Sequence, residues 1–359
     1  MKIPDYIAGL KPYKPGKPIE ELEREYGISD SIKLASNENP LGPSPKAAET
    51  IRDALKNLHR YPDGNSHYLR KRLGEKLKVA VNRIVFGNGS NEIIELLVRT
   101  FLREGDEVVM PEPSFLMYEI MVQAAGGRPV KVALRERVLD LEGMAESISS
   151  RTRMIFVNNP NNPTGTIVSR RDFEAFLERV PPEVIVAVDE AYIEFVRDRT
   201  CPNGLDYLDG DKIVVTLRTF SKAYGLAGLR IGYGVMKESL ADAIHRVRQP
   251  FNTNLLAQVG ALAALDDGAF LDKTVNTVHN GLDFLYREVE KLGLRCLPTQ
   301  TNFFLIDVER DAKSVFEKML RRGVIVRAMT EYGYPHYIRI NVGLPEENQR
   351  FVEVLREVI

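Results

Sequence analysis

Short apolar runs, each bounded by glycine, proline or polar residues, recur through the first 216 residues of the chain. Their length and their content of valine and isoleucine predict buried strands. Between them apolar residues fall at helical spacing, as in the segment with Ile51, Leu55 and Leu58. Strand and helix in alternation predict an α/β fold, a mainly parallel sheet with helices on both faces. The predicted strands are 32–35, 83–86, 107–110, 154–157, 184–188 and 212–216.

After Pro250 the pattern changes to long helical spacing and then to a compact α+β unit. The predicted helices there are 255–265, 270–292, 312–321 and 346–358, and the strands are 302–308, 324–327 and 337–342. Prolines at 4, 12, 15 and 18 favour an extended segment before a short helix at 19–26, lying on a partner chain or on its own domain. We divide the chain into an N-terminal arm (1–30), a large domain (31–250) and a smaller C-terminal domain with its connecting helix (251–359).

With 359 residues, 44% of them apolar, the chain can bury a large core. Its 49 basic and 50 acidic residues nearly cancel, which gives no general attraction to nucleic acid or to an anionic membrane. Two cysteines, Cys201 and Cys296, and five scattered histidines supply neither a disulfide framework nor zinc spacing, so we expect no metal. Without a signal peptide or an apolar run of membrane-span length, a cytoplasmic protein is expected.

One lysine is distinguished by its neighbours. Lys222 lies in TLRTFSKAYGLAGLRIGYG (216–234), after an apolar strand and before small residues. Partial desolvation lowers the pKa of such an amine and makes it a nucleophile, as a Schiff-base lysine must be. The cofactor that this indicates is pyridoxal 5'-phosphate. The alternative is a solvated loop lysine among glycines that only turn the chain.

Two segments offer donors to the phosphate of such a cofactor. Thr219, Ser221 and Arg230 flank the lysine with two hydroxyls and a guanidinium. In GNGSNEIIELLVRTFL a strand, a glycine turn and a capped helix start present backbone amides and the helix dipole to an anion. The residues at that turn are Gly89, Ser90 and Asn91, of which Ser90 and Asn91 can cap the following helix. Ordinary strand-to-helix turns have the same pattern, so this segment counts only together with the others.

Other segments offer groups to the cofactor ring. Asp189 ends the buried run VIVAV, where open α/β sheets bind ligands, and can keep a pyridine nitrogen protonated; it can also cap a helix. Asn162, in NNPNNPTG, and Tyr192 can reach the ring oxygen. Phe115, near the start of a helix, can stack on the ring or simply pack in the core.

Two arginines, Arg327 in GVIVRAM and Arg339 in YIRINVG, interrupt apolar strands. A partly buried arginine needs an anionic partner, either a structural carboxylate or an anionic substrate. Tyr61, in the turn of RYPDGN, can offer an exposed phenol to a ligand or merely pack its ring. Glu190 and Glu194 are expected to be solvated charges.

Together these segments resemble the fold-type I pyridoxal-phosphate aminotransferases over nearly the whole length, and most closely their histidinol-phosphate branch. The motifs that carry the resemblance are LKPYKPGKP (10–18), NENPLGPSP (37–45), RYPD (60–63), GNGSNEII (87–94), NNPNNPTG (158–165), VDEAYIEF (188–195), TFSKAYGLAGLRIGY (219–233) and YIRINVG (337–343). The lysine, DEAY and NNPTG motifs are the most specific. Relatives often carry a tyrosine where this chain has Phe115, which keeps the stacking and loses a hydroxyl.

The resemblance implies that Lys222 is the catalytic Schiff-base lysine, that Asp189 faces the pyridine nitrogen, and that Tyr192 supports the ring hydroxyl with Asn162. It also implies substrate binding by Arg339, with Arg327 assisting and Tyr13 closing from the arm. Tyr61 is expected to reach the cofactor phosphate of another subunit, which implies a homodimer with shared sites.

The implied reaction transfers the amino group of histidinol phosphate to 2-oxoglutarate, giving imidazole-acetol phosphate and glutamate, as in histidine biosynthesis. Two guanidiniums can bind either the phosphate or the carboxylates. The alternatives are an aromatic or broad-range amino-acid aminotransferase and a decarboxylase of a phosphorylated amino acid. A cofactor-sensing regulator domain is disfavoured, because no basic helix-turn-helix motif accompanies the chain.

Overall fold

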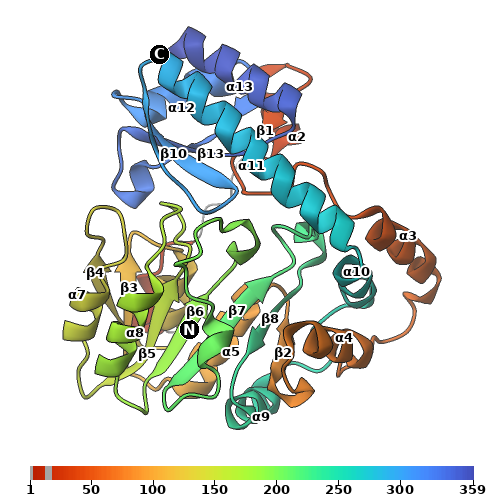
Figure 1. The fold of residues 1–359 in the computed structure, drawn as a ribbon, viewed down its shortest axis with the longest axis vertical. Coiled ribbons are helices and arrows are strands. Elements are labelled where there is room, and N and C mark those ends of the chain that lie inside the picture. Colours follow the sequence, from red (N-terminus) through yellow and green to blue (C-terminus); the bar gives the residue numbers. More distant parts are fainter. Residues whose placement is uncertain (1–2, 13–17) are drawn as a thin grey trace.

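A seven-stranded sheet forms the centre of the larger part of the computed structural model, which describes residues 3–12 and 18–359 (Figure 1). Six strands are parallel, and β8 runs antiparallel to both of its neighbours. The predicted α/β class is therefore confirmed. In order across the sheet the strands are β2 (Ile84–Gly87), β8 (Gly232–Val235), β7 (Ile213–Thr219), β6 (Ile185–Asp189), β5 (Thr152–Asn158), β3 (Glu107–Glu112) and β4 (Arg128–Ala133).

The central strands are mostly apolar because helices cover both faces of the sheet. In β6, Ile185 and Ala187 pack toward one face while Val186 and Val188 pack toward the other, and all four are buried. Burying each of the larger side chains stabilises the fold by about 1.5–3 kcal/mol. On the first face lie α5 (Ser90–Phe101), α6 (Met117–Ala124) and α9 (Glu238–Val247), and on the second α7 (Leu141–Glu146) and α8 (Arg170–Arg179).

A second, four-stranded antiparallel sheet lies above the first in Figure 1. Its strands, in order, are β12 (Arg327–Ala328), β13 (Tyr337–Asn341), β10 (Phe303–Asp307) and β9 (Arg295–Leu297). Helices α11 (Gly268–Lys291), α12 (Ala312–Leu320) and α13 (Pro345–Val358) pack on it around one apolar core. Against the edge of the large sheet near β2 and β8 lie α3 (Pro45–Ala54), α4 (His67–Leu77) and α10 (Leu255–Leu265).

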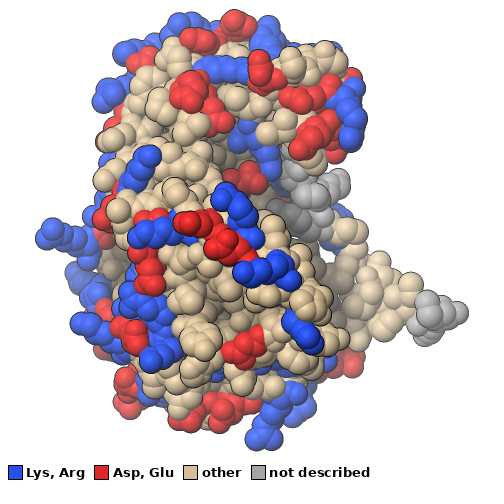
Figure 2. Space-filling model, turned by 90° about the vertical axis from the view of Figure 1, so that its right-hand side faces the viewer, with Lys and Arg blue, Asp and Glu red and all other residues tan. Residues whose placement is uncertain are grey.

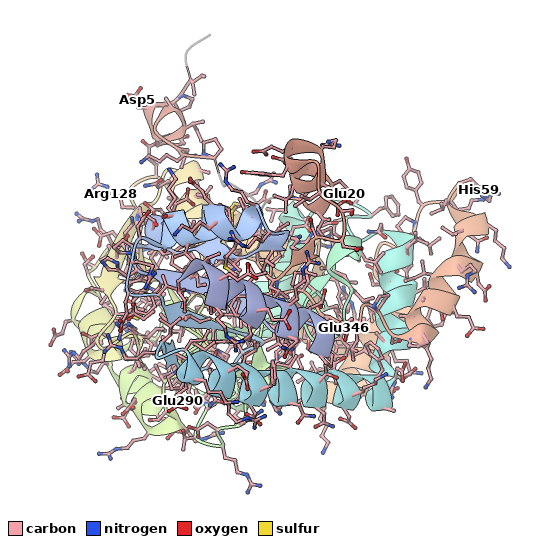
Figure 3. The ribbon with its side chains drawn as sticks, turned by 90° about the horizontal axis from the view of Figure 1, so that it is seen from above. Asp5, Glu20, His59, Arg128, Glu290 and Glu346 are labelled. Carbon is pink, nitrogen blue, oxygen red and sulfur yellow. The ribbon has the colours of Figure 1, made fainter. Side chains whose placement is uncertain are left out.

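The N-terminal segment packs on the C-terminal part of the chain. Strand β1 (Ile32–Lys33) pairs in parallel with β11 (Val324–Ile325), and Leu22 of α2 (Ile19–Tyr26) is buried against Leu320. In contrast, α1 (Asp5–Ala8) buries none of its residues and projects from the body where Asp5 is labelled (Figure 3). The pairing of β1 with β11 places the polar loop that follows β1 between the two sheets.

Some sequence expectations are wrong. Ile51, Leu55 and Leu58 were expected on the apolar side of one amphipathic helix, but Leu55 and Leu58 are 48% and 58% exposed. Helix α3 ends at Ala54, so Leu55 lies in the short 3-10 helix Leu55–Asn57 that follows and Leu58 lies beyond it, outside the core. Strands β4, β8 and β9 were not predicted: β4 is a half-buried edge strand, and two of the four residues of β8 are glycines.

In the part of the chain that the structure describes, no helix is both long and apolar enough to cross a membrane. Basic and acidic side chains are interspersed over the face shown in Figure 2. Among the described residues, that face presents no continuous basic area of the kind that binds nucleic acid.

Candidate active site

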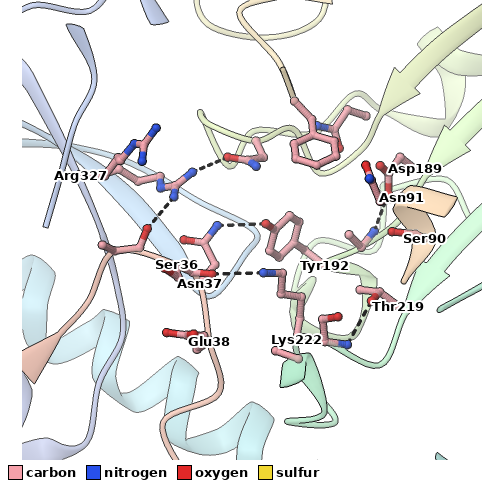
Figure 4. A pocket seen from close by; sticks show the side chains of 18 of the residues that line it. Ser36, Asn37, Glu38, Ser90, Asn91, Asp189, Tyr192, Thr219, Lys222 and Arg327 are labelled. Carbon is pink, nitrogen blue, oxygen red and sulfur yellow. Dashed lines mark hydrogen bonds between the residues drawn. The ribbon is translucent and has the colours of Figure 1, made fainter. Parts of the chain in front are cut away.

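A cavity of about 240 Å³ opens where β5, β6 and β7 end, between the large sheet and the C-terminal unit (Figure 4). The carboxyl ends of parallel strands are where open α/β sheets bind ligands. Twelve of the predicted site residues line it: Ser90, Asn91, Phe115, Asn162, Asp189, Tyr192, Thr219, Ser221, Lys222, Arg230, Arg327 and Arg339. They come from segments spread over about 250 positions, so the fold brings together what the sequence keeps apart.

Lys222 follows β7 and points into this cavity. Its Nζ donates a hydrogen bond to the carbonyl of Ser36 (3.2 Å) and lies 5.8 Å from the centre of the Tyr192 ring. Desolvation, with a smaller contribution from the positive charge of Arg339, lowers the pKa of this amine to about 8. Lys222 is therefore not a solvated loop lysine, and a useful share of it is neutral near neutral pH.

Asp189 is the last residue of β6 and is buried. Its Oδ2 accepts a hydrogen bond from the phenol of Tyr118 (2.6 Å), and its Oδ1 accepts one from the amide of Ala191 (3.2 Å). Burial raises the pKa of this carboxyl to about 6, because the cost of desolvation exceeds the effect of both hydrogen bonds. No helix starts directly after it, so its side chain is not used as a helix cap.

Tyr192 and Asn162 lie on the side of the cavity nearer the C-terminal unit. The hydroxyl of Tyr192 accepts a hydrogen bond from Nδ2 of Asn37 (3.0 Å), and burial raises its pKa to about 12. The side-chain oxygen of Asn162 accepts one from Nη1 of Arg339 (2.6 Å). Asn162, which we expected at a ring oxygen, is thus in contact with a substrate-binding candidate in this structure.

Arg327 and Arg339 are cross-strand partners on β12 and β13, so their guanidiniums share one face of the small sheet. Arg339 is buried, donates to the carbonyl of Ala35 (2.9 Å), and lies over the ring of Phe303 (5.1 Å). Arg327 contacts the half-exposed Glu331 at 3.4 Å. Two arginines side by side in the cavity wall can each bind an anion through a pair of N–H donors.

The opposite end of the cavity holds a compact group of donors. Gly89, not Ser90 or Asn91, is the N-cap of α5, with φ of 76°, and this corrects the expected capping. A side chain at Gly89 would begin 2.4 Å from Nη2 of Arg230, so only glycine lets the guanidinium cross here. Arg230 also donates to Ser221 Oγ (3.3 Å). We call Gly89, Ser90, Asn91 and Arg230 the cradle.

The cradle fits a phosphate. It combines the positive end of the α5 dipole and its first amides with a guanidinium, and the hydroxyls of Thr219 and Ser221 face the same space. The side-chain oxygen of Asn91 is buried and has no hydrogen-bond partner among the described residues. Such an orphaned polar atom is costly unless a ligand or water satisfies it.

Three predicted residues need separate comment. Tyr61 does not line the cavity; it is 83% exposed and stacks on Phe251. Phe115 precedes α6 instead of lying on it, and its ring meets Tyr118 edge-on at 5.5 Å. Tyr13 lies outside the described residues.

The sequence reasoning missed several residues of the site. Tyr118 lies three positions after Phe115, and that spacing was the available signal; Asn37 and Glu38 lie in a polar loop whose position depends on the β1–β11 pairing. Glu190 was expected to be solvated but is 1% exposed and bonded to Arg218. Glu194 is half-buried, and burial raises its pKa to about 7, so that expectation was wrong as well.

A lysine, a buried carboxylate and an anion cradle at the carboxyl ends of parallel strands define a pyridoxal-phosphate-type transferase site, and the comparisons agree. Residues 29–355 match the family model for aminotransferase class I and II. The chain belongs to this family, as the motifs predicted.

Within the family the chain is similar to proteins named histidinol-phosphate aminotransferase. It is 47% identical over 359 residues to the one from Moorella thermoacetica, covering 100% of this chain and 93% of that protein. It is also 47% identical over 362 residues to the one from Desulfotalea psychrophila, covering 100% and 96%. The crystal structure of histidinol-phosphate aminotransferase from Sinorhizobium meliloti in complex with pyridoxal-5'-phosphate has a TM-score of 0.92 at 28% identity, with 99% and 97% coverage.

Proposed function

We propose that this chain is a pyridoxal-phosphate-dependent aminotransferase that exchanges the amino group of histidinol phosphate with 2-oxoglutarate. The observation that carries the proposal is the shared cavity of Lys222, Asp189 and the arginine pair. A desolvated amine, a buried carboxylate and two anion-binding forks meet there within one fold. The names and full-length similarity of the relatives point to the same reaction.

The cradle, Asp189 and Lys222 would hold the phosphate, the ring nitrogen and the aldehyde carbon of the cofactor. When bound, the cofactor supplies a positively charged ring that withdraws electrons from the substrate carbon. Asp189 would keep the ring nitrogen protonated, and Tyr118 would orient the carboxylate for that contact through its hydrogen bond to Oδ2. Tyr192, whose hydroxyl accepts a hydrogen bond from Asn37, would support the ring hydroxyl.

Lys222 acts first as the covalent anchor and then as the acid–base group. With the substrate bound, its Nζ would remove the proton from the amine-bearing carbon of the substrate and hold that proton for return. A pKa near 8 suits this double role, because a base works best when its pKa is close to the operating pH.

The arginine pair positions both substrates. Arg339 and Arg327 would bind the phosphate of histidinol phosphate in the first half-reaction and a carboxylate of 2-oxoglutarate in the second. Asn162 and the carbonyl of Ala35 hold Arg339 in place for this task. A planar guanidinium can serve both anions, because each offers two oxygens to the fork.

We also propose that the chain works as a homodimer. Tyr61 and Phe251 form an exposed aromatic pair that a second copy of the chain would cover. From that surface Tyr61 would reach the cofactor phosphate of the partner, and Tyr13 would close over the substrate.

A half-reaction experiment tests the proposed reaction. Protein loaded with pyridoxal phosphate is mixed with histidinol phosphate alone, and the visible absorption of the cofactor is followed. We expect bleaching, followed by recovery and one glutamate per site when 2-oxoglutarate is added. Borohydride reduction before mixing should mark the peptide that contains Lys222. Bleaching by phenylalanine with equal efficiency would contradict the assigned substrate, and a mark on another lysine would contradict the site.

A further inference from the structure

Two loops outside the cavity meet in the aromatic pair, Tyr61 and Phe251. Their ring centroids are 4.8 Å apart with the planes inclined by 20°, although the residues are 83% and 44% exposed. Phe251 has φ of 57°, a left-handed conformation that is rare for an aromatic residue. The backbone is thus held in an unfavourable conformation while the ring is presented to solvent, which indicates that its surroundings fix it there.

Arg248 fixes both loops. Its Nη2 donates to the carbonyl of Gly64 (3.0 Å), and its Nη1 donates to Oδ1 of Asn252 (2.5 Å). Gly64 in turn lies against the ring of Phe251, since a Cβ placed there would be 3.5 Å from it. The aromatic pair is therefore positioned through Asn252 and the backbone at 64, and not by ring stacking alone.

Glu92, in the first turn of α5, connects Asn252 to the residue that precedes the cradle. Its Oε2 accepts three hydrogen bonds, from Nδ2 of Asn252 (2.8 Å), from the amide of Asn88 (2.5 Å) and from Nδ2 of Asn88 (3.2 Å). Asn88 closes this cycle of hydrogen bonds, because its Nδ2 also donates to the carbonyl of Asn252 (2.6 Å). Charge-assisted bonds of this kind are stronger and better defined than neutral ones.

On its other side Asn88 leads into the cradle. It directly precedes Gly89, and its carbonyl accepts a hydrogen bond from Nη2 of Arg230 (3.4 Å). Arg230 crosses Gly89 so closely that no side chain fits between them. A shift of Asn88 therefore moves both the amide end of α5 and the guanidinium that we assign to the phosphate.

We propose that Glu92 is a positioning residue that couples phosphate binding in the cradle to the contact of the aromatic pair with a second copy of this chain. The inference rests on the proposed function, which places a cofactor phosphate in the cradle and a partner on the pair. Glu92 does not line the cavity, so it acts through Asn88 and Asn252. Such coupling is reciprocal: phosphate binding tightens the dimer by the same factor by which the dimer tightens phosphate binding.

The test measures the dimer dissociation constant by sedimentation, with and without pyridoxal phosphate. In the wild type the cofactor is expected to lower this constant by about 5- to 150-fold, the usual range for coupling between two sites. In Glu92→Ala the ratio should fall to the smaller value that the direct contact of Tyr61 with the partner's phosphate sustains, and in Glu92→Gln, which keeps an acceptor oxygen without the charge, it should be intermediate. Glu95→Ala, an exposed position on the same helix, is the matched control and should keep the wild-type ratio.

A wild-type ratio in Glu92→Ala, or an equal loss in Glu95→Ala, would overturn the coupling. A wild-type chain that stays monomeric with and without cofactor would overturn it together with the homodimer. In that case the half-reaction with histidinol phosphate, run on the same sample, shows separately whether the proposed reaction holds. Should Glu92→Ala fail to fold, as judged by circular dichroism, Glu92→Gln decides: a reduced ratio supports the coupling and an unchanged ratio overturns it.

Discussion

The phenol of Tyr118 donates a 2.6 Å hydrogen bond to Oδ2 of Asp189, and so connects α6 to the end of β6. The tyrosine ring is itself fixed, because it is buried and stacks on Phe156 with centroids 4.4 Å apart and planes 6° apart. The orientation of the buried carboxylate is thus set by the core of the large sheet and not by the cavity wall alone.

Removing that hydroxyl should weaken cofactor binding. In Tyr118→Phe, Asp189 keeps only the bond from the Ala191 amide, so its ionised form loses a donor and its pKa rises further. A hydrogen bond to a charged group contributes about 1.5–3 kcal/mol. Its loss predicts a dissociation constant for pyridoxal phosphate that is roughly 10- to 100-fold higher. Fluorescence titration measures it. Tyr207→Phe, whose hydroxyl contacts the exposed Glu174, is the control, and an equal effect there would refute the assignment.

The stability of the cofactor-free protein should fall as pH rises from about 4 to about 6. The pKa of Asp189 is raised from 3.8 to about 6 in the folded state, so its contribution is fully present below pH 4 and is lost as the carboxyl ionises. A shift of about two pKa units corresponds to on the order of 3 kcal/mol. Urea unfolding at a series of pH values tests this. Asp189→Asn should flatten that part of the profile, and an unchanged profile would show that other groups cause the dependence.

Lys222→Ala should abolish turnover without unfolding the chain. Loss of the acid–base group alone costs about 100- to 10,000-fold, and loss of the covalent anchor adds to that. Because the folded pKa of Lys222 is lowered to about 8, its charge destabilises the fold below that pH, and the variant should be at least as stable as the wild type at pH 7. Single-turnover kinetics and thermal unfolding measure the two effects. Residual turnover within tenfold of the wild type would exclude Lys222 as the catalytic lysine.

Arg339→Lys and Arg327→Lys should raise KM for both histidinol phosphate and 2-oxoglutarate. Lysine keeps the charge but cannot make the two parallel hydrogen bonds of a guanidinium. This predicts a roughly 10- to 100-fold rise in KM, larger at the buried Arg339. Arg295→Lys, on the exposed end of the same small sheet, is the control. An effect on only one of the two substrates would argue against shared use of the arginine pair.

Glu190→Gln should destabilise the chain more than replacement of the whole ion pair does. Glu190 accepts from Nε of Arg218 at 2.8 Å, and both residues are buried. Breaking a buried pair leaves one charge unpaired, at a cost of about 3–5 kcal/mol, whereas replacing both partners is often neutral. Denaturant unfolding of Glu190→Gln beside Glu190→Gln/Arg218→Met tests this, and equal losses in the two variants would contradict it.

The sequence was sufficient for the parts of the fold that are decided locally. Apolar runs such as 184–188 are buried on both faces and form strands wherever they lie, and helix 255–265 has the predicted bounds. Prediction from the sequence failed where a tertiary contact decides the environment of a residue. Glu190 has the local pattern of a surface charge, and its burial is made tolerable by Arg218 from the neighbouring strand together with the amide of Gly204.

The site shows the same division. Lys222 follows a buried strand and Asp189 ends one, which fixes their place at the sheet edge. Tyr118 and Asn37 carry no such signal, because one depends on how α6 packs and the other on the pairing of β1. Asn162 and Arg339 belong to two different units of the fold. Nothing in the sequence around either residue predicts the hydrogen bond between them.

The pairing of Ile32 and Lys33 with Val324 and Ile325 also bears on how the enzyme is made. A ribosome must translate almost the entire message before the second strand emerges, whereas the segments of the large sheet are complete well before that. The loop that carries Ser36, Asn37 and Glu38 therefore reaches its place beside the lysine only near the end of synthesis. A nascent chain halted earlier can form the part of the active-site cavity that the large sheet supplies, but it lacks the part that this loop supplies.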